Sequence, residues 1–176
     1  MVLNLETLRT GILGLTPEAC AFYLQACTVC LVHSNHINGV NAILSETYSD
    51  DIQLNWTSIV DKATIKSWGD MQEATEYGAT AIAILLAKEL TEYTCIERSS
   101  KGTGFDYWLG EEDDIELFQR KARLEISGIL REATTNTLEQ RVKIKEEQTN
   151  ITAHTNMKAH ICITEFSNPK CAYKII

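Results

Sequence analysis

Two segments decide the fold: Phe105-Asp106-Tyr107-Trp108-Leu109 and Ala122-Arg123-Leu124-Glu125-Ile126-Ser127-Gly128-Ile129. Each predicts a strand that carries an acidic residue among apolar and aromatic neighbours. A carboxylate inside a strand is costly to bury unless it is paired, hydrogen-bonded or bound to a cation. We therefore expect Asp106 and Glu125 to meet in one site.

The order of elements around these two strands defines a core over residues 65–168. The expected elements are a helix over 65–90, strands over 93–97, 105–109 and 122–130, a helix over 136–148, and a strand over 159–166 that Asn168-Pro169 ends. The three consecutive strands predict an antiparallel meander. A helical crossover to the last strand favours parallel, right-handed geometry. The small residues of Gly78-Ala79-Thr80-Ala81 predict a close packing contact on the first helix.

Residues 1–60 predict an extension of this core. Thr16-Pro17-Glu18 is a helix start, and an apolar helix follows over 19–32. Strands over 40–44 and 52–56 predict a hairpin that extends the sheet or covers one edge. We expect one α/β (α+β) domain over 1–176, with a central mixed β-sheet flanked by helices.

Composition narrows the function classes. The chain has 176 residues, 44% of them hydrophobic, enough for a sizeable core. It has no apolar run of the roughly 18 residues that span a bilayer, and no secretory signal at its start, so we expect a cytoplasmic protein without membrane contact. The net charge of −8 disfavours nucleic acid as a partner unless a local basic patch or a partner subunit provides the site. A protein partner or a homo-oligomer is the alternative.

Six cysteines lie mostly in apolar runs and are expected to be reduced and buried. Cys27 and Cys30, followed by His33 and His36, form the one spacing that suggests metal or thiol chemistry. These residues advance by three along a predicted helix, so they spiral around it rather than converge. A small-molecule enzyme that uses these histidines and a cysteine remains an alternative, beside histidines that merely end a helix.

The expected site gathers side chains from three elements. Strand alternation places Arg123, Glu125 and Ser127 on one face. Glu73 and Glu76 on the preceding helix offer a third carboxylate. Such a cluster suits Mg²⁺, which prefers oxygen ligands and keeps several waters. The acidic segment 110–114 is expected to be a solvated connection, because it lacks the spacing of a calcium loop.

This layout resembles the core of the PD-(D/E)xK nuclease superfamily, in which a glutamate-bearing helix precedes a meander with an aspartate and a Glu-x-Lys. The resemblance matches Asp106 to the motif aspartate, Glu125 to the motif glutamate, and Glu76, or less well Glu73, to the helix glutamate. It implies Mg²⁺ or Mn²⁺ held by Asp106 and Glu125, and hydrolysis of phosphodiester bonds of DNA or RNA. Ser127 stands where the superfamily has lysine. Arg123 is nearest but is a poor base, and the crossover helix offers Arg141, Lys143 or Lys145 instead.

A second hypothesis keeps the fold without catalysis. Ser127 and the acidic net charge both favour an inactive nuclease-fold subunit that serves as a structural or interaction module. The resemblance suggests a multi-protein defence or mobile-element system as its setting. No P-loop, dinucleotide-binding glycine pattern, nucleophile elbow or HExxH occurs to favour another chemistry.

Overall fold

One eight-stranded mixed sheet organises the protein in the computed structural model, which describes residues 1–112, 116–150 and 155–176. In spatial order its strands are β1 (Val2–Asn4), β3 (Asp50–Asn55), β2 (Val40–Glu46), β8 (Lys170–Ile175), β7 (Lys158–Glu165), β6 (Ala122–Ile129), β5 (Tyr107–Gly110) and β4 (Thr94–Arg98). Parallel and antiparallel pairs both occur, so the expected α/β class with a mixed sheet is confirmed.

The core follows the predicted order. Strands β4, β5 and β6 form an antiparallel meander, and β7 pairs with β6 in parallel over eight residues. Helix α4 (Leu138–Thr149) makes the crossover between β6 and β7. The predicted acidic segment 110–114 lies between β5 and β6, and its last two residues fall outside the described residues.

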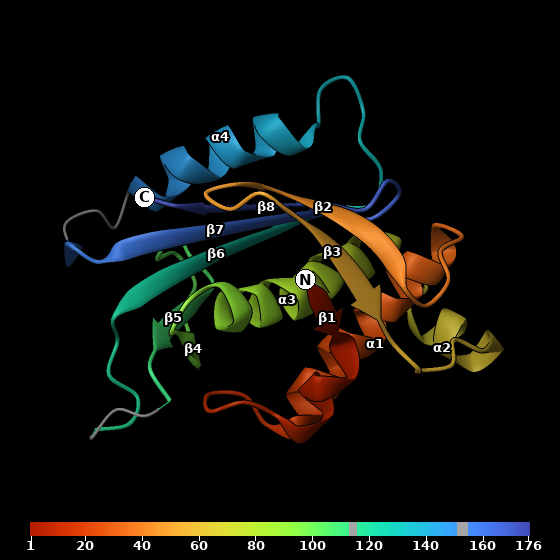
Figure 1. Cartoon of the computed structure of the whole chain (residues 1–176), viewed down its shortest axis with the longest axis horizontal. Coiled ribbons are helices and arrows are strands. Elements are labelled where there is room, and N and C mark those ends of the chain that lie inside the picture. Colours follow the sequence, from red (N-terminus) through yellow and green to blue (C-terminus); the bar gives the residue numbers. More distant parts are fainter. Residues whose placement is uncertain (113–115, 151–154) are drawn as a thin grey trace.

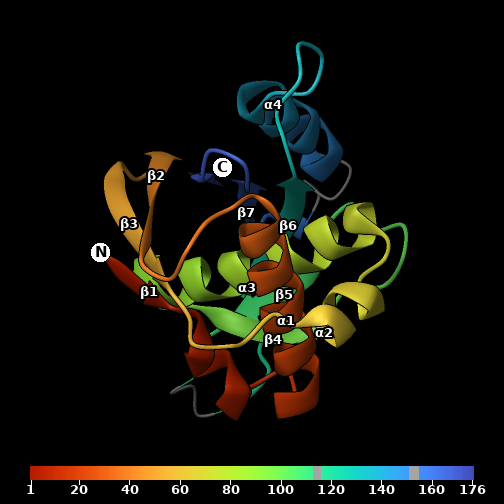
Figure 2. The same cartoon turned by 90° about the vertical axis from the view of Figure 1, so that its right-hand side faces the viewer.

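Helices cover both faces of the sheet. Helix α4 lies on one face, and α1 (Pro17–His33) and α3 (Met71–Leu90) lie on the other (Figures 1 and 2). The close contact predicted at the small residues of α3 is confirmed. A β-carbon added to Gly78 would lie 3.0 Å from the Cα of Cys27 in α1, so only glycine permits this approach of the two helices.

The structure corrects one sequence expectation and adds two strands. The single helix predicted over 65–90 is two helices, α2 (Lys62–Ser67) and α3, because the Asp70 side chain caps a new start by accepting the backbone N–H groups of Gln72 and Glu73. The predicted end of the strand before Asn168-Pro169 is confirmed, but a further strand that was not predicted, β8, follows and returns antiparallel to β7. The mixed pattern of residues 4–15 predicts a short helix, and the structure forms the 3₁₀ helix η1 (Leu5–Thr10) there, preceded by a strand that was not predicted, β1.

Strand β8 joins the N-terminal hairpin to the core. Strands β2 and β3 form the predicted antiparallel hairpin, and β2 pairs in parallel with β8. The hairpin therefore extends the sheet, as one of the two sequence alternatives proposed, and β1 completes that side by pairing with β3.

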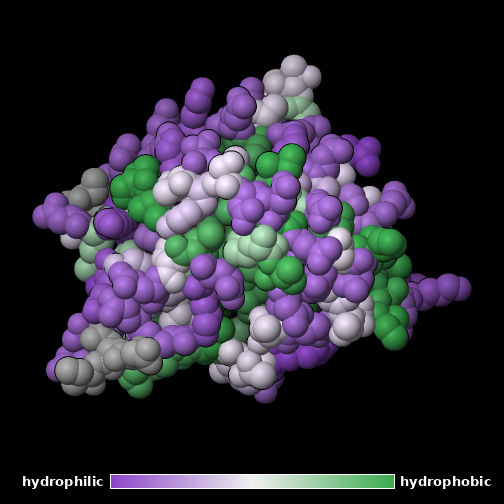
Figure 3. Space-filling model, viewed as in Figure 1, coloured by the Kyte–Doolittle hydropathy of each residue, from purple (hydrophilic) through white to green (hydrophobic). Residues whose placement is uncertain are grey.

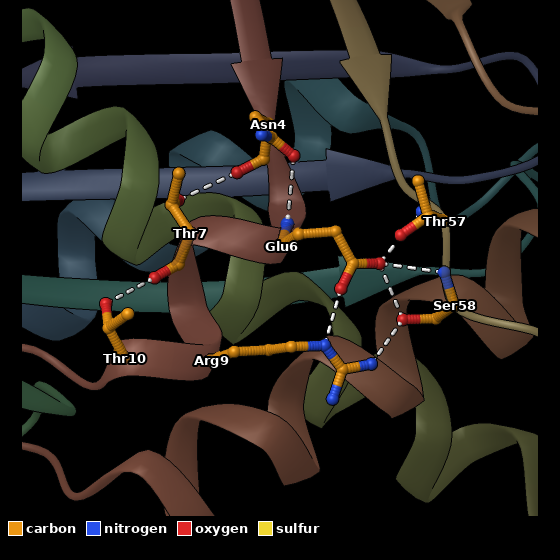
Figure 4. Close-up of polar contacts among 7 residues, drawn as sticks. All are labelled: Asn4, Glu6, Thr7, Arg9, Thr10, Thr57 and Ser58. Carbon is orange, nitrogen blue, oxygen red and sulfur yellow. Dashed lines mark hydrogen bonds and ion pairs between the residues drawn. The ribbon is translucent and has the colours of Figure 1, made fainter.

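A carboxylate fastens η1 to the segment after β3 (Figure 4). Glu6 Oε1 accepts the backbone N–H groups of Thr57 and Ser58, each at 2.8 Å, and its Oε2 accepts Arg9 Nε at 2.6 Å. Partial burial raises the pKa of Glu6, but hydrogen bonds from Ser58, Arg9 and Thr57 lower it further, to about 2. The charged form of Glu6 thus stabilises this junction.

The surface is mainly polar. Polar side chains cover most of the face seen in Figure 3, and hydrophobic ones form separate patches. Within the described residues, none of the helices combines the length and the apolar character needed to cross a bilayer.

Candidate functional site

Asp106 occupies the point where β5 and β6 part. The regular pairing of these strands covers Tyr107 to Leu109, so Asp106 lies one residue before β5 rather than within it. Its backbone N–H still donates to Leu124 O at 2.8 Å, and its Oδ2 accepts the backbone N–H of Ile126 at 2.8 Å. The Asp106 carboxylate thus accepts a β6 N–H group just before β5 begins. This hydrogen bond directs the carboxylate toward Glu125.

Glu125 lies on β6 and is only 2% exposed. Two side chains of α4 donate to its Oε1: Lys145 through Nζ, and Gln148 through Nε2 at 3.0 Å. Lys145 also donates to Gln148 Oε1 at 3.0 Å, so the three side chains form a closed set. The expectation that a lysine of the crossover helix reaches the site is met by Lys145.

Contacts between β6 and α4 repeat at regular intervals along both elements. Alternate residues of β6 face α4, where Arg123 donates to the Thr149 carbonyl at 3.0 Å and Ser127 accepts from Arg141 at 3.0 Å. Two residues along a strand advance about 6.6 Å and four along a helix about 6 Å, so contacts repeat at every fourth helical residue. The predicted shared face of Arg123, Glu125 and Ser127 is confirmed.

Burial raises the pKa of both carboxyl groups, and the charge of Asp106 adds to this effect at Glu125. Burial, and then the charge of Asp106, raise the pKa of Glu125 to about 7, against the lowering effect of Lys145. Burial likewise raises the pKa of Asp106, against the Ile126 N–H and the Lys145 ammonium. Asp106 raises the pKa of Glu125 through its charge, and a hydrogen bond with Glu125 lowers the pKa of Asp106, so the two side chains converge as the sequence predicts.

A cavity of about 360 Å³ opens beside this pair. Glu76 of α3 lines it together with Asp106, Ser127, Arg141 and Lys145. A second cavity, of about 550 Å³, is lined by both Asp106 and Glu125. Asp106 therefore borders both cavities, and Glu76 faces the first from the opposite helix.

Other predicted residues lie elsewhere. Lys143 is exposed on α4, two residues from Lys145 and hence on the opposite side of the helix, and it lines neither cavity. Glu73 is exposed on α3 and lines neither cavity as well. Arg123 is buried, and its guanidinium donates to the carbonyls of Thr149 and Met157. It thus fastens β6 to the end of α4.

The cysteine and histidine spacing does not form a site. Cys27 and Cys30 are buried in α1, and burial raises the pKa of both thiols. His33 is exposed at the last residue of α1, and His36 Nε2 lies 2.9 Å from the Phe166 carbonyl. All six cysteines are free and buried, as expected.

Two site residues were missed by sequence reasoning. Gln148 follows Lys145 by three residues, a helical spacing that could have predicted its contact with Glu125. Arg98 lines both cavities from the end of β4, and it pairs in register with Tyr107. Only the strand pairing, which the sequence does not reveal, places Arg98 there.

The carboxyls of Asp106 and Glu125 are the candidate ligands for a divalent cation. Among the described residues, no three His, Cys, Asp or Glu side chains converge to hold a metal ion. Mg²⁺ needs only one or two carboxylates, because it keeps several waters. The adjoining carboxyls of Asp106 and Glu125 fit that requirement, and a bound cation would offset the burial that raises both pKa values and the repulsion that adds to it at Glu125.

Comparison with models of known protein families, with curated proteins and with solved structures finds no match to this chain.

Proposed function

We propose that this chain is a nuclease-like enzyme that uses a divalent metal ion to hydrolyse phosphodiester bonds of DNA or RNA. The observation that carries the proposal is the convergence of Asp106, Glu125 and Lys145 from the start of β5, from β6 and from α4. Two carboxyls and one ammonium are the groups that the PD-(D/E)xK resemblance implies, and here the ammonium comes from the crossover helix.

Asp106 and Glu125 would hold Mg²⁺ or Mn²⁺. When bound, the ion would stabilise negative charge on a phosphoryl oxygen and favour the ionisation of water. The backbone N–H of Ile126 fixes the Asp106 carboxylate, and Gln148 fixes that of Glu125, so both groups are oriented before the ligand arrives.

Three further side chains have roles around the reacting phosphate. Glu76 would orient the attacking water from the opposite side of the cavity. Lys145 would donate a hydrogen bond to a phosphoryl oxygen, taking the place of the lysine that Ser127 replaces. Arg141, held by Ser127 and by Asn136, would add positive charge on the same wall.

Cleavage of labelled single-stranded DNA, duplex DNA and RNA tests the proposal. We expect cleavage with Mn²⁺ or Mg²⁺, none with EDTA, and a fall of at least about 100-fold for Asp106→Asn or Glu125→Gln. Lys145→Gln should also reduce the rate, whereas Lys143→Gln, on the exposed side of the same helix, should leave it unchanged.

The same preparations should be heated with and without Mn²⁺. A metal-dependent rise in melting temperature that disappears in Asp106→Asn would locate the ion at the proposed site. The proposal is wrong if no substrate is cut and Mn²⁺ does not raise the melting temperature.

A catalytically inactive nuclease-fold module is the second candidate. The specific observation in its favour is that Lys145 and Gln148 both occupy Glu125 Oε1, which is the arrangement of a structural ion pair. This candidate predicts no thermal shift with Mn²⁺ and co-purification with a protein partner.

A further inference from the structure

Three cavities adjoin one another along the site, and together they are called the groove. The middle cavity, of about 360 Å³, shares Arg98 and Asp106 with the cavity of about 550 Å³ on one side. It shares Glu76, Ser127 and Arg141 with a cavity of about 530 Å³ on the other side. The groove therefore passes the carboxylates and continues beyond them in both directions.

The groove is positively charged although the chain is acidic. The five cationic side chains that line it are Lys101, Arg98, Lys145, Arg141 and Arg131, and the three acidic ones are Glu76, Asp106 and Glu125. The whole chain carries a net charge of −8. The excess of cations is thus local to the groove, and its distribution along the groove suits a run of phosphates.

Aromatic rings stand at the wall of the middle cavity. Tyr77 lines the cavity, and the ring of Phe22 lies 4.9 Å from that of Tyr77 and 4.7 Å from that of Trp68. Phe22 is 45% exposed although it sits in this cluster. Tyr23 packs against Tyr77, and its hydroxyl lies 2.8 Å from that of Tyr107, which fixes the base of the cluster.

We propose that the groove binds single-stranded nucleic acid, with phosphates along the five cations and a base stacked on Phe22 and Tyr77. The proposal rests on the proposed function, whose substrate class it narrows. Aromatic faces bind bases that are free of a partner strand, whereas bases in a duplex already stack on one another. Cations alone would serve duplex and single strand alike. The exposed Phe22 ring packs on Tyr77, which lines the middle cavity together with Arg98 and Arg141, and this aromatic surface favours the single strand.

Fluorescence anisotropy with EDTA present tests binding separately from cleavage. The probes are end-labelled single-stranded DNA, single-stranded RNA and duplex DNA of one sequence. We expect both single strands to bind at least about tenfold tighter than the duplex. Phe22→Leu keeps an apolar side chain but removes the ring, and should weaken single-strand binding about 5- to 100-fold. Phe118→Leu is the matched control, since Phe118 is 52% exposed and lies in the segment between β5 and β6, outside the ring cluster of Phe22, Trp68 and Tyr77.

The salt dependence tests the role of the cations. Arg131→Gln removes one cation at the far end of the groove, and should lower the slope of log affinity against log salt by about 0.7. The melting temperatures of Arg131→Gln and Phe118→Leu should match that of the wild type, because both side chains are exposed. Phe22→Leu loses ring contacts with Trp68 and Tyr77, so its melting temperature should fall slightly while the protein stays folded at the assay temperature.

The outcomes separate this inference from the proposed function. Equal or tighter binding of duplex, or unchanged binding by Phe22→Leu, overturns the inference even if metal-dependent cleavage is found. Single-strand binding that depends on Phe22, in a protein that cuts nothing, supports the groove and overturns the nuclease activity. Absence of binding to every probe overturns the inference outright.

Discussion

Replacing Glu125 with glutamine should stabilise the protein at alkaline pH and not at acid pH. Burial and the neighbouring Asp106 raise the pKa of Glu125 from 4.5 to about 7. Because the folded-state pKa lies above the unfolded one, the carboxyl contributes its full stability below pH 4.5 and loses it as pH rises to 7. A shift of this size corresponds to about 3 kcal/mol at pH 8. Glutamine has no proton to lose and avoids that loss.

The melting temperature measures this effect. In a chain of this length about 3 kcal/mol corresponds to roughly 6–12 °C. Glutamine also removes the ion pair with Lys145, so the informative quantity is the difference between the two proteins at pH 5 and at pH 8. The gain of Glu125→Gln over the wild type should grow by several degrees between these pH values.

A matched control is Glu73→Gln, because Glu73 is exposed on α3 and lines none of the three cavities. Its melting temperature should follow that of the wild type at both pH values. The reasoning is refuted if the two glutamine variants differ from the wild type by the same amount at pH 5 and at pH 8. A stabilised Glu125→Gln variant that no longer cuts nucleic acid would indicate that the buried carboxylate is kept for function at the expense of stability.

Three more outcomes follow from the packing and the charges. Glu6→Gln should lower the free energy of unfolding by about 2 kcal/mol in urea titrations at pH 7. Because the pKa of Glu6 in the folded protein is lowered to about 2, this difference should fade as pH falls from 4.5 toward 2. Gly128→Ala should lower the melting temperature by several degrees, because its β-carbon would lie 2.3 Å from the Thr75 carbonyl oxygen, whereas at Gly69 the nearest atom is 3.8 Å away and alanine should be harmless. The six thiols should not react with a thiol reagent in the native protein and should all react after unfolding; fast reaction of Cys27 or Cys30 would restore the thiol-enzyme hypothesis.

The sequence predicted the order of the core elements because their patterns are local. Strand alternation in 122–129 and apolar spacing in α3 need no knowledge of distant residues. The break before α3 was also locally encoded, by the capping residue Asp70, but the prediction extended the helix back across it to residue 65. Strand β8 was missed although it forms a hairpin with β7 around the Asn168-Pro169 turn. Its parallel pairing with the distant β2 leaves no periodic signal in the sequence.

The residues of the site were likewise predicted only in part. Asp106 and Glu125 were identified because acidic residues are unusual inside apolar strands. The sequence offered both Lys143 and Lys145, and helix phase decides between them, since residues two apart point about 200° apart around the axis. Arg98 depends on the register of β4 with β5, which only the folded sheet defines.

The ammonium at Glu125 comes from twenty residues further along the chain instead of two. A pattern search that requires lysine two residues after the strand glutamate would not select this chain, because Ser127 stands at that position. Proteins of this layout should instead be sought by asking whether a basic residue on the crossover helix falls in phase with the strand carboxylate. Such a search would compare the position of the positive charge in the folded protein, and not its position in the sequence motif.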